Sequence, residues 1–249
     1  MKKLVAFDLD GTLAASKQPI DADMAALLAG LLRVVDVTVI SGGDWPQFEK
    51  QVVGQMPKDA DFSRLWIMPT TGAKLYRPDA QGAWQPVYAD DFSDTERKQI
   101  LDALDSAVET TGLKEAKTWG DQIEDRGTQI TFSGLGQEAP LDAKTAWDPD
   151  FAKRKKLQAA LKPLLPGLSV NVGGSTSIDI TREGVDKGWG LNRLASESGF
   201  TLDEMIFLGD AIYPGGNDYP AQQAGVASIK VRDPADTATA VRAITLALG

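Results

Sequence analysis

The chain has 249 residues, which is enough for one large domain or for two domains with separate cores. Its net charge of −9 argues against broad nucleic-acid binding, which needs clustered Lys and Arg, but a locally basic pocket could still take a small anionic substrate. It has no cysteine and no histidine, which excludes thiolate chemistry, Ser-His-Asp hydrolysis and His-ligated zinc. Catalysis must therefore use carboxylates, lysines, hydroxyls and backbone amides, with or without a hard metal ion.

The first apolar run is short. It consists of the four residues Leu4 to Phe7 and ends at Asp8, which makes it too short for the core of a signal peptide. No later run approaches the length of a membrane span. We therefore expect a cytoplasmic protein with neither a membrane nor a nucleic acid as its partner.

The two ends of the chain alternate short apolar runs with segments of helical periodicity. Strands are expected at 3–7, 35–40, 65–68, 205–208 and 226–231, and helices at 22–33, 44–54, 188–198 and 234–247. Asp21 is a plausible N-cap for the first helix. Such alternation predicts an α/β fold with an open, doubly wound and mostly parallel sheet.

The middle of the chain has a different pattern. It predicts a hairpin at 74–88, helices at 94–110 and 150–162, and strands within 122–133 and 168–181. We expect an α+β domain over residues 81–184, inserted between residues 1–80 and 185–249 of the α/β domain. The basic run at 153–156 is expected to be a solvated helix face.

Asp8 and Asp10 follow the first predicted strand. Residues two apart on a strand point to one face, and ligands of open α/β sheets bind at the carboxyl ends of strands. Two close carboxylates repel each other, and a divalent cation relieves that repulsion. Gly11 permits a sharp turn and Thr12 adds a hydroxyl. An isolated Asp-x-Asp pair is nevertheless common on protein surfaces.

Three further features stand at the ends of predicted core elements. Ser41 and Gly42 close the second strand, with a hydroxyl and flexible amides suited to a phosphoryl oxygen. Lys187 stands where a helix begins, and Asp210 ends a later strand as a natural metal ligand. Taken singly, these features could be a serine-glycine turn, a surface lysine and a structural turn.

The motifs are more specific as an ordered set. Asp8 to Thr12, then Ser41-Gly42, then Lys187, then Gly209-Asp210 followed by Asn217-Asp218, resemble the haloacid dehalogenase (HAD) superfamily of phosphatases and phosphomutases. The resemblance implies a Rossmann-like HAD core, and the insert matches the α+β cap domain of that superfamily.

The resemblance also implies roles. Asp8 would attack phosphorus to form an aspartyl-phosphate, and Asp10 would protonate the leaving oxygen and activate the next nucleophile. Mg²⁺ would be held by Asp8, by the backbone carbonyl of Asp10 and by Asp210. Ser41 and Lys187 would orient and neutralise the phosphoryl group. The remaining residues implied at the core site are Thr12 and Gly42 as substrate contacts, and Asn217 and Asp218 as support for the metal ligands or for Lys187.

Within the superfamily the chain is most similar to the eukaryotic-type phosphomannomutase family. The likeness rests on Pro214 to Asp218, on Gly173-Gly174-x-x-Ser177-x-Asp179 and on Asp186-Lys187. It implies a sugar phosphate or similar small phosphorylated metabolite as substrate, and it allows a homodimer, since related mutases dimerise through their caps. It also implies substrate-binding residues that should face the core motifs: Arg126, Lys144, Ser177 and Asp179, together with Lys17 beside the core motif.

The arginines of that family are incompletely matched. Arg126 fits one position, although it could be a surface arginine, whereas Gln137 and Lys144 occupy two others and Lys17 a further one. A mutase must bind phosphate at both ends of its intermediate, and lysine cannot reproduce the bidentate fork of arginine. We therefore expect an Mg²⁺-dependent sugar phosphatase, with phosphomannomutase or phosphohexomutase activity as the alternative. A non-catalytic binding protein with the same fold is a third reading.

Overall fold

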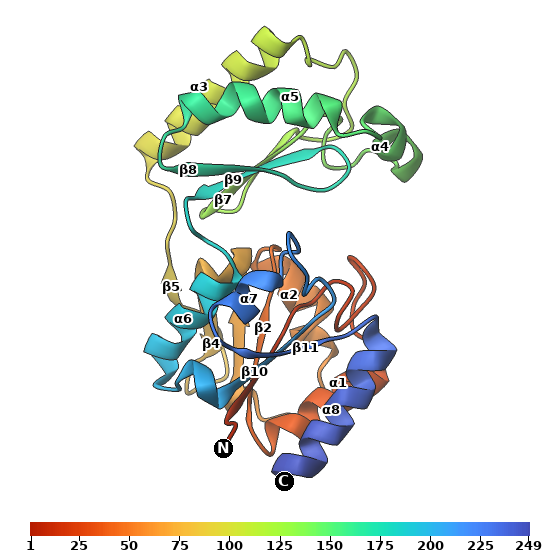
Figure 1. Cartoon of the computed structure of the whole chain (residues 1–249), viewed down its shortest axis with the longest axis vertical. Helices are drawn as coiled ribbons and strands as arrows, with labels where there is room; N and C mark the ends of the chain where they lie inside the picture. The colour runs from red at the N-terminus through yellow and green to blue at the C-terminus, as the bar shows by residue number, and fades with distance from the viewer. The chain divides into compact units, whose positions relative to one another are not determined.

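The computed structural model describes residues 1–249, and the chain divides into two compact units. The first unit combines residues 1–89 and 185–249, and the second comprises residues 90–184. The sequence placed the beginning of the inserted domain at residue 81, nine residues before this division. Figure 1 shows the α/β elements of the first unit and the sheet and helices of the second.

The first unit is built on one seven-stranded sheet. Its strands are β1 (Leu4–Phe7), β2 (Asp36–Ile40), β3 (Leu65–Met68), β4 (Lys74–Pro78), β5 (Trp84–Ala89), β10 (Met205–Gly209) and β11 (Ala227–Lys230). They lie in the order β11-β10-β1-β2-β3-β4-β5, and the five from β11 to β3 are parallel. The expected doubly wound, mostly parallel sheet is confirmed.

Helices cover both faces of this sheet (Figure 1). Those of the first unit are α1 (Ala22–Leu32), α2 (Trp45–Gln51), α6 (Lys187–Ser198), α7 (Tyr219–Gln223) and α8 (Pro234–Leu248). Short 3₁₀ turns lie at Val53–Gln55, Phe62–Arg64, Thr70–Gly72 and Leu202–Glu204. Helices α1, α2 and α8 share one apolar core with the sheet, and α6 and α7 share another on the opposite face. The carboxylate of Asp21 accepts the Met24 N–H, so the predicted N-cap is confirmed.

The hairpin formed by β4 and β5 belongs to the sheet of the first unit rather than to the inserted unit. Strand β4 pairs antiparallel with β3, and β5 pairs with β4. Without this hairpin, β3 would leave a row of backbone N–H and C=O groups unpaired at an edge. This pairing extends the core sheet by two strands and explains why the division falls after Ala89.

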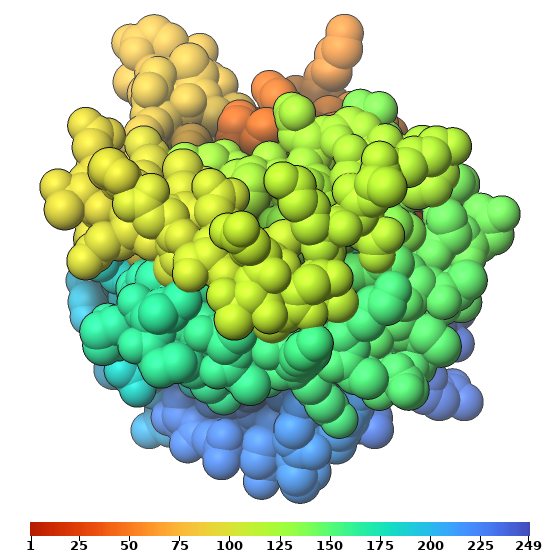
Figure 2. Space-filling view, turned by 90° about the horizontal axis from the view of Figure 1, so that it is seen from above, coloured from red at the N-terminus to blue at the C-terminus, as the bar shows by residue number.

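The second unit is a four-stranded antiparallel sheet with helices on one face. Its strands are β6 (Ile123–Asp125), β7 (Gln129–Ser133), β8 (Leu168–Val172) and β9 (Ser177–Arg182), in the order β6-β7-β9-β8. Its helices are α3 (Asp94–Thr111), α4 (Leu141–Trp147), α5 (Ala152–Leu161) and a 3₁₀ turn at Lys162–Leu164. Figure 2 shows one face of the molecule, on which the residues coloured from yellow to green, including those of α3 and α5, lie at the surface.

Alternation along the strands separates the two faces of this smaller sheet. The apolar side chains of β7 and β9 are Ile130, Phe132, Ile178 and Ile180. They share one core with the apolar side chains of α3 and α5, which are Ile100, Leu104, Leu157 and Leu161. The intervening positions of the same strands carry polar residues: Gln129, Thr131, Ser133, Ser177, Asp179 and Thr181. The sheet therefore has one face that forms a core and one polar face.

One helix of this region was not predicted, and one prediction is corrected. Helix α4 was not expected, because its seven residues lack a sustained apolar stripe. The basic run of α5 is not wholly solvated, since Arg154 is buried and its Nε lies 2.7 Å from Oδ2 of Asp148. A buried guanidinium needs a counter-charge, and the loop before α5 supplies it. None of the helices is long and apolar enough to cross a membrane.

Candidate active site

The sequence motifs of the first unit meet at one edge of its sheet. Strands β10, β1 and β2 are adjacent and parallel, so their carboxyl ends lie side by side. Asp8 follows β1, Ser41 follows β2 and Asp210 follows β10. Lys187 is the first residue of α6, on the face of the sheet that this helix covers.

Lys187 is the centre of this site. Its Nζ donates to Oδ1 of Asp8 and to Oδ1 of Asp218, at 2.5 Å in each case. All three side chains are buried, with Asp218 fully enclosed. The second oxygen of Asp218 accepts the backbone N–H of Ala211 at 2.9 Å. Both oxygens of Asp218 are therefore used to hold Lys187 and the loop after β10.

The electrostatics of the site follow from this burial. Desolvation raises the pKa of Asp8 to about 6, although the Lys187 ammonium acts in the opposite direction. Burial alone would lower the pKa of Lys187, but the carboxylates of Asp8 and Asp218 outweigh it and hold that pKa above its usual value. Burial and the nearby Asp218 also raise the pKa of Asp210. At neutral pH, Asp8 is ionised beside a protonated lysine.

Thr12 links the ends of β1 and β10. Its hydroxyl donates to Oδ2 of Asp8 at 3.3 Å and accepts the backbone N–H of Asp210 at 3.1 Å. Gly11 has φ of +87°, and a Cβ at this position would lie 2.6 Å from an oxygen of Asp210. Glycine is therefore required here both for the turn and for the close approach of Asp210.

Three carboxylates at this edge have the composition of a divalent-cation site. Oxygens of Asp8, Asp210 and Asp218 all lie within 4.8 Å of one another. Three carboxylates (−3) and the Lys187 ammonium (+1) give a formal charge of −2. Oxygen donors and this charge fit a hard dication such as Mg²⁺.

The Asp10 carboxylate is turned to a different set of partners. Strand β1 ends at Phe7, so the strand periodicity that predicted a common direction for Asp8 and Asp10 does not extend this far. Oδ1 of Asp10 accepts the backbone N–H of Lys17 at 2.7 Å, and Nε2 of Gln47 lies 3.5 Å from Oδ2. The hydrogen bond between Lys17 and Asp10 therefore involves the main chain of Lys17 and the carboxylate of Asp10.

The loop of Ser41 and Gly42 is tied to the segment that follows β3. The carbonyl of Ser41 accepts the Thr71 N–H, and the carbonyl of Gly43 accepts the Thr70 N–H, each at 2.8 Å. Ser41 is buried and Gly42 is half-buried.

Ser177 and Asp179 lie together on the polar face of the sheet in the second unit. A Cβ added to Gly173 would lie 2.6 Å from Oγ of Ser177 and from Oδ2 of Asp179, so both side chains converge over this glycine. The other carboxylate oxygen of Asp179 accepts the hydroxyl of Thr131 at 2.8 Å. Arg126 forms a two-point ion pair with Glu124, at 3.0 and 2.8 Å.

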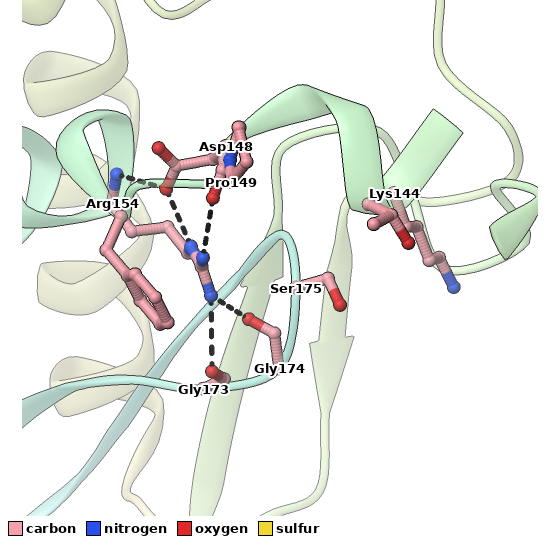
Figure 3. Close-up of a pocket in the computed structure, with 9 residues that line it drawn as sticks. Lys144, Asp148, Pro149, Arg154, Gly173, Gly174 and Ser175 are labelled. Carbon is pink, nitrogen blue, oxygen red and sulfur yellow. Dashed lines mark hydrogen bonds and ion pairs between the residues drawn. The ribbon is translucent and has the colours of Figure 1, made fainter. Parts of the chain in front are cut away.

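Lys144 lines a pocket of about 290 Å³ together with Gly173 and Gly174. Its Nζ donates to the backbone carbonyl of Gln137 at 2.9 Å. Figure 3 shows the ammonium pointing away from Arg154, whose guanidinium is bonded to Asp148 and to the carbonyls of Gly173 and Gly174.

Several contacts of the site were not anticipated from the sequence. Gln47 approaches Asp10 from the first turn of α2, and Glu124 forms an ion pair with the guanidinium of Arg126. Thr71 contacts the Ser41 loop, and the only sign of this contact in the sequence was the polar pair Thr70-Thr71 shortly after β3. Asn217, by contrast, is exposed, whereas its neighbour Asp218 is fully buried.

The chain is similar to known proteins over most of its length. The family model for eukaryotic phosphomannomutase matches residues 24–247. The phosphomannomutase of Schizosaccharomyces pombe is 28% identical over 224 residues, covering 88% of this chain and 84% of that protein. Human phosphomannomutase 1 is 27% identical over 222 residues, covering 87% and 81%.

A solved structure supports the fold. A haloacid dehalogenase-like hydrolase from Bacteroides thetaiotaomicron superposes with a TM-score of 0.66 at 17% identity, covering 98% of this chain and 100% of that one. The expected HAD-type fold is confirmed. The family match spans most of both units, so the chain belongs to the eukaryotic phosphomannomutase family of the haloacid dehalogenase superfamily.

Proposed function

We propose that this protein is a phosphohexomutase that moves a phosphoryl group between the 1- and 6-positions of a hexose phosphate. The observation that carries the proposal is the buried Lys187 ammonium held between Asp8 and Asp218. The Lys187 ammonium opposes the rise in the pKa of Asp8 that burial causes, and it supplies a cation for the incoming phosphoryl group. The substrate class is proposed from the family and from its members named as phosphomannomutases.

Asp8 is proposed as the nucleophile. A carboxylate oxygen of Asp8 forms a bond to phosphorus while the bond from phosphorus to the sugar oxygen breaks, which leaves an aspartyl-phosphate and a free hydroxyl. A pKa of about 6 leaves Asp8 ionised at neutral pH, as this attack requires. Lys187 and the amides around Ser41 then balance the charge that spreads over the phosphoryl oxygens.

Asp10 is proposed as the proton donor and acceptor. In the first half-reaction it gives its proton to the sugar oxygen that leaves phosphorus, and in the second it takes a proton from the hydroxyl that attacks the aspartyl-phosphate. The carboxylate of Asp10 accepts hydrogen bonds from the Lys17 N–H and from Gln47, and neither of these donors is hydrogen-bonded to Asp8. These bonds support a separate role for Asp10, because they orient its carboxylate independently of Asp8.

Mg²⁺ is the proposed cofactor, with Asp8, the backbone carbonyl of Asp10 and Asp210 as its protein ligands. The formal charge of −2 and the clustered oxygens support this choice. When bound, Mg²⁺ would neutralise charge on the nucleophile and the phosphoryl group. Asp218 is proposed as the anchor of Lys187, because both of its oxygens are already used.

The sugar and its second phosphate are proposed to bind in the second unit. Ser177 and Asp179 offer a hydroxyl and a carboxylate to sugar hydroxyls, while Arg126 and Lys144 offer positive charge to a phosphate. Glu124 competes with a phosphate for Arg126, and Lys144 carries a point charge. These two features favour a second candidate function, a phosphatase that needs only one phosphate site.

One experiment separates the two functions. Purified protein with Mg²⁺ is given mannose 1-phosphate and a trace of hexose 1,6-bisphosphate, and phosphorus NMR follows 6-phosphate and inorganic phosphate together. The mutase predicts 6-phosphate as the main product, with Asp8→Asn as the inactive control. Release of inorganic phosphate without 6-phosphate would contradict the mutase proposal and support the phosphatase. Turnover that survives Asp8→Asn unchanged would contradict the covalent route for both.

A further inference from the structure

The segment between β3 and β4 has an unusual backbone. Thr70 and Thr71 have φ of +47° and +60°, and Thr71 has ψ of +30°. A β-branched residue in the left-handed region is a genuine outlier, and here two such residues are consecutive. Strain of this kind persists only where the surrounding structure enforces it, and it is often found at functional sites.

This corner, residues 70–72, determines the direction of the Ser41 loop. The backbone N–H groups of Thr71 and Thr70 donate to the carbonyls of Ser41 and Gly43, respectively. In a trans peptide the N–H points opposite to the preceding carbonyl, so the Gly42 N–H is turned away from the corner. Because β2 lies between β3 and β1, the Ser41 loop has this corner on one side and the end of β1, where Asp8 stands, on the other.

The same corner contacts the helix that carries Lys187. A Cβ on Gly190 would lie 2.9 Å from the carbonyl oxygen of Thr71, and a Cβ on Gly72 would lie 2.7 Å from Cα of Gly190. Gly190 is three residues after Lys187, so both lie on one side of α6. The hydroxyl of Tyr88, from β5, holds the Gly72 carbonyl at 2.9 Å.

We infer that the strained Thr70–Thr71 corner is the positioning element that sets the Ser41–Gly42 peptide and Lys187 at a fixed separation around the phosphoryl group. Thr71 is thus a positioning residue that acts through its backbone rather than through its hydroxyl. The inference rests on the proposed phosphoryl transfer at Asp8. It adds to the site a residue that contacts neither the sugar nor the nucleophile.

The test compares three variants with the wild-type protein. Thr71→Gly relieves the strain and frees the corner, Thr71→Val keeps the branched shape without the hydroxyl, and Phe151→Gly relieves a left-handed residue of the second unit, with φ of +65°, as the matched control. Turnover of mannose 1-phosphate with Mg²⁺, affinity for orthovanadate with Mg²⁺ and thermal unfolding are measured for each protein.

We expect Thr71→Gly to lower kcat by about 10- to 100-fold, with KM little changed and Tm equal to or above that of the wild type. A residue that only supports the fold would lose Tm together with activity. Thr71→Val and Phe151→Gly should keep the wild-type kcat. Wild-type kcat in Thr71→Gly, or an equal loss in Thr71→Val, would overturn the inference.

Vanadate separates this inference from the proposed function. If the wild-type protein binds vanadate but turns over no sugar phosphate, the proposed substrate is wrong. The corner is still tested in that case, since Thr71→Gly should bind vanadate about tenfold more weakly. Equal vanadate affinity in Thr71→Gly and wild type would overturn the positioning role while leaving the phosphoryl site in place.

Discussion

The ammonium of Lys187 lies 2.5 Å from a carboxylate oxygen of Asp8, although 179 positions separate the two residues in the chain. The same ammonium lies 2.5 Å from Asp218. A buried lysine between two buried carboxylates joins the beginning of the chain to its last third. This triad links the stability of the first unit to the charge state of its candidate nucleophile.

Removing the cation should therefore destabilise the protein. Lys187→Met leaves Asp8 and Asp218 buried without a counter-charge, and we expect a loss of about 3–5 kcal/mol in the free energy of unfolding. The double variant Lys187→Met/Asp218→Asn should recover part of that loss without recovering turnover. Urea unfolding gives the free energy of unfolding of both variants. An unchanged urea midpoint in Lys187→Met would contradict a structural role for the contacts of Lys187 with Asp8 and Asp218.

Mg²⁺ should stabilise the protein in a manner that depends on pH. The pKa of Asp8 is raised in the folded protein, so a proton on Asp8 stabilises the metal-free fold at low pH, and this contribution is lost as pH rises through about 6. Mg²⁺ competes with that proton. We expect saturating Mg²⁺ to raise Tm by about 5–10 °C at pH 8 and by less at pH 5.

The control for this prediction is Asp210→Asn, which removes a proposed ligand and leaves the triad of Asp8, Lys187 and Asp218 in place. Its Tm should respond weakly to Mg²⁺ at both pH values. A response of equal size at pH 5 and pH 8 in the wild-type protein would show that the ion binds away from Asp8.

Substrate binding in the second unit should depend on the guanidinium of Arg126. Arg126→Ala removes a charged hydrogen-bond donor, and we expect kcat/KM for a sugar phosphate to fall about 10- to 100-fold. Arg126→Lys should recover only part of this, because it lacks the planar fork. Full activity in Arg126→Ala would indicate that the pair with Glu124 is structural alone.

The ion pair of Glu96 and Arg182 should make the second unit sensitive to acid. Hydrogen bonds from Arg182 and from the Ser93 N–H lower the pKa of Glu96 to about 2, from a usual value of 4.5. A lowered pKa contributes stability above pH 4.5, and this stability is lost as pH falls toward 2. Wild type should therefore exceed Glu96→Gln in Tm at pH 7, and the difference should shrink between pH 4.5 and 2.

Much of the first unit could be predicted from the sequence. The periodicity of residues 22–33 and the capping carboxylate of Asp21 are local features, so α1 follows from them directly. Asp8, Ser41 and Asp210 could be assigned to one edge because parallel strands place their carboxyl ends together. These predictions needed only local pattern and general topology.

Other features depended on long-range packing. The hairpin at β4 and β5 has the same local pattern whether it joins the core sheet or the insert, and only its pairing with β3 decides. Arg154 has the sequence context of a solvated helix face, yet it is buried against Asp148. A one-dimensional pattern does not show which side of a charged helix is covered by another segment.

The sequence by itself determined which functional groups this protein can use and in what order they stand along the chain. It has neither histidine nor cysteine, and it carries carboxylates, a lysine and a serine at the ends of the core elements of an α/β fold. The tertiary structure decided which partner each group meets. In the folded protein the ammonium of Lys187 donates to Asp8 and Asp218. The carboxylate of Asp10 accepts from Lys17 and Gln47, and the N–H of Thr71 donates to the Ser41 carbonyl. The direction of a side chain past the end of a strand depends on how α6 and the loops pack across the sheet, and residues distant in the chain fix that packing.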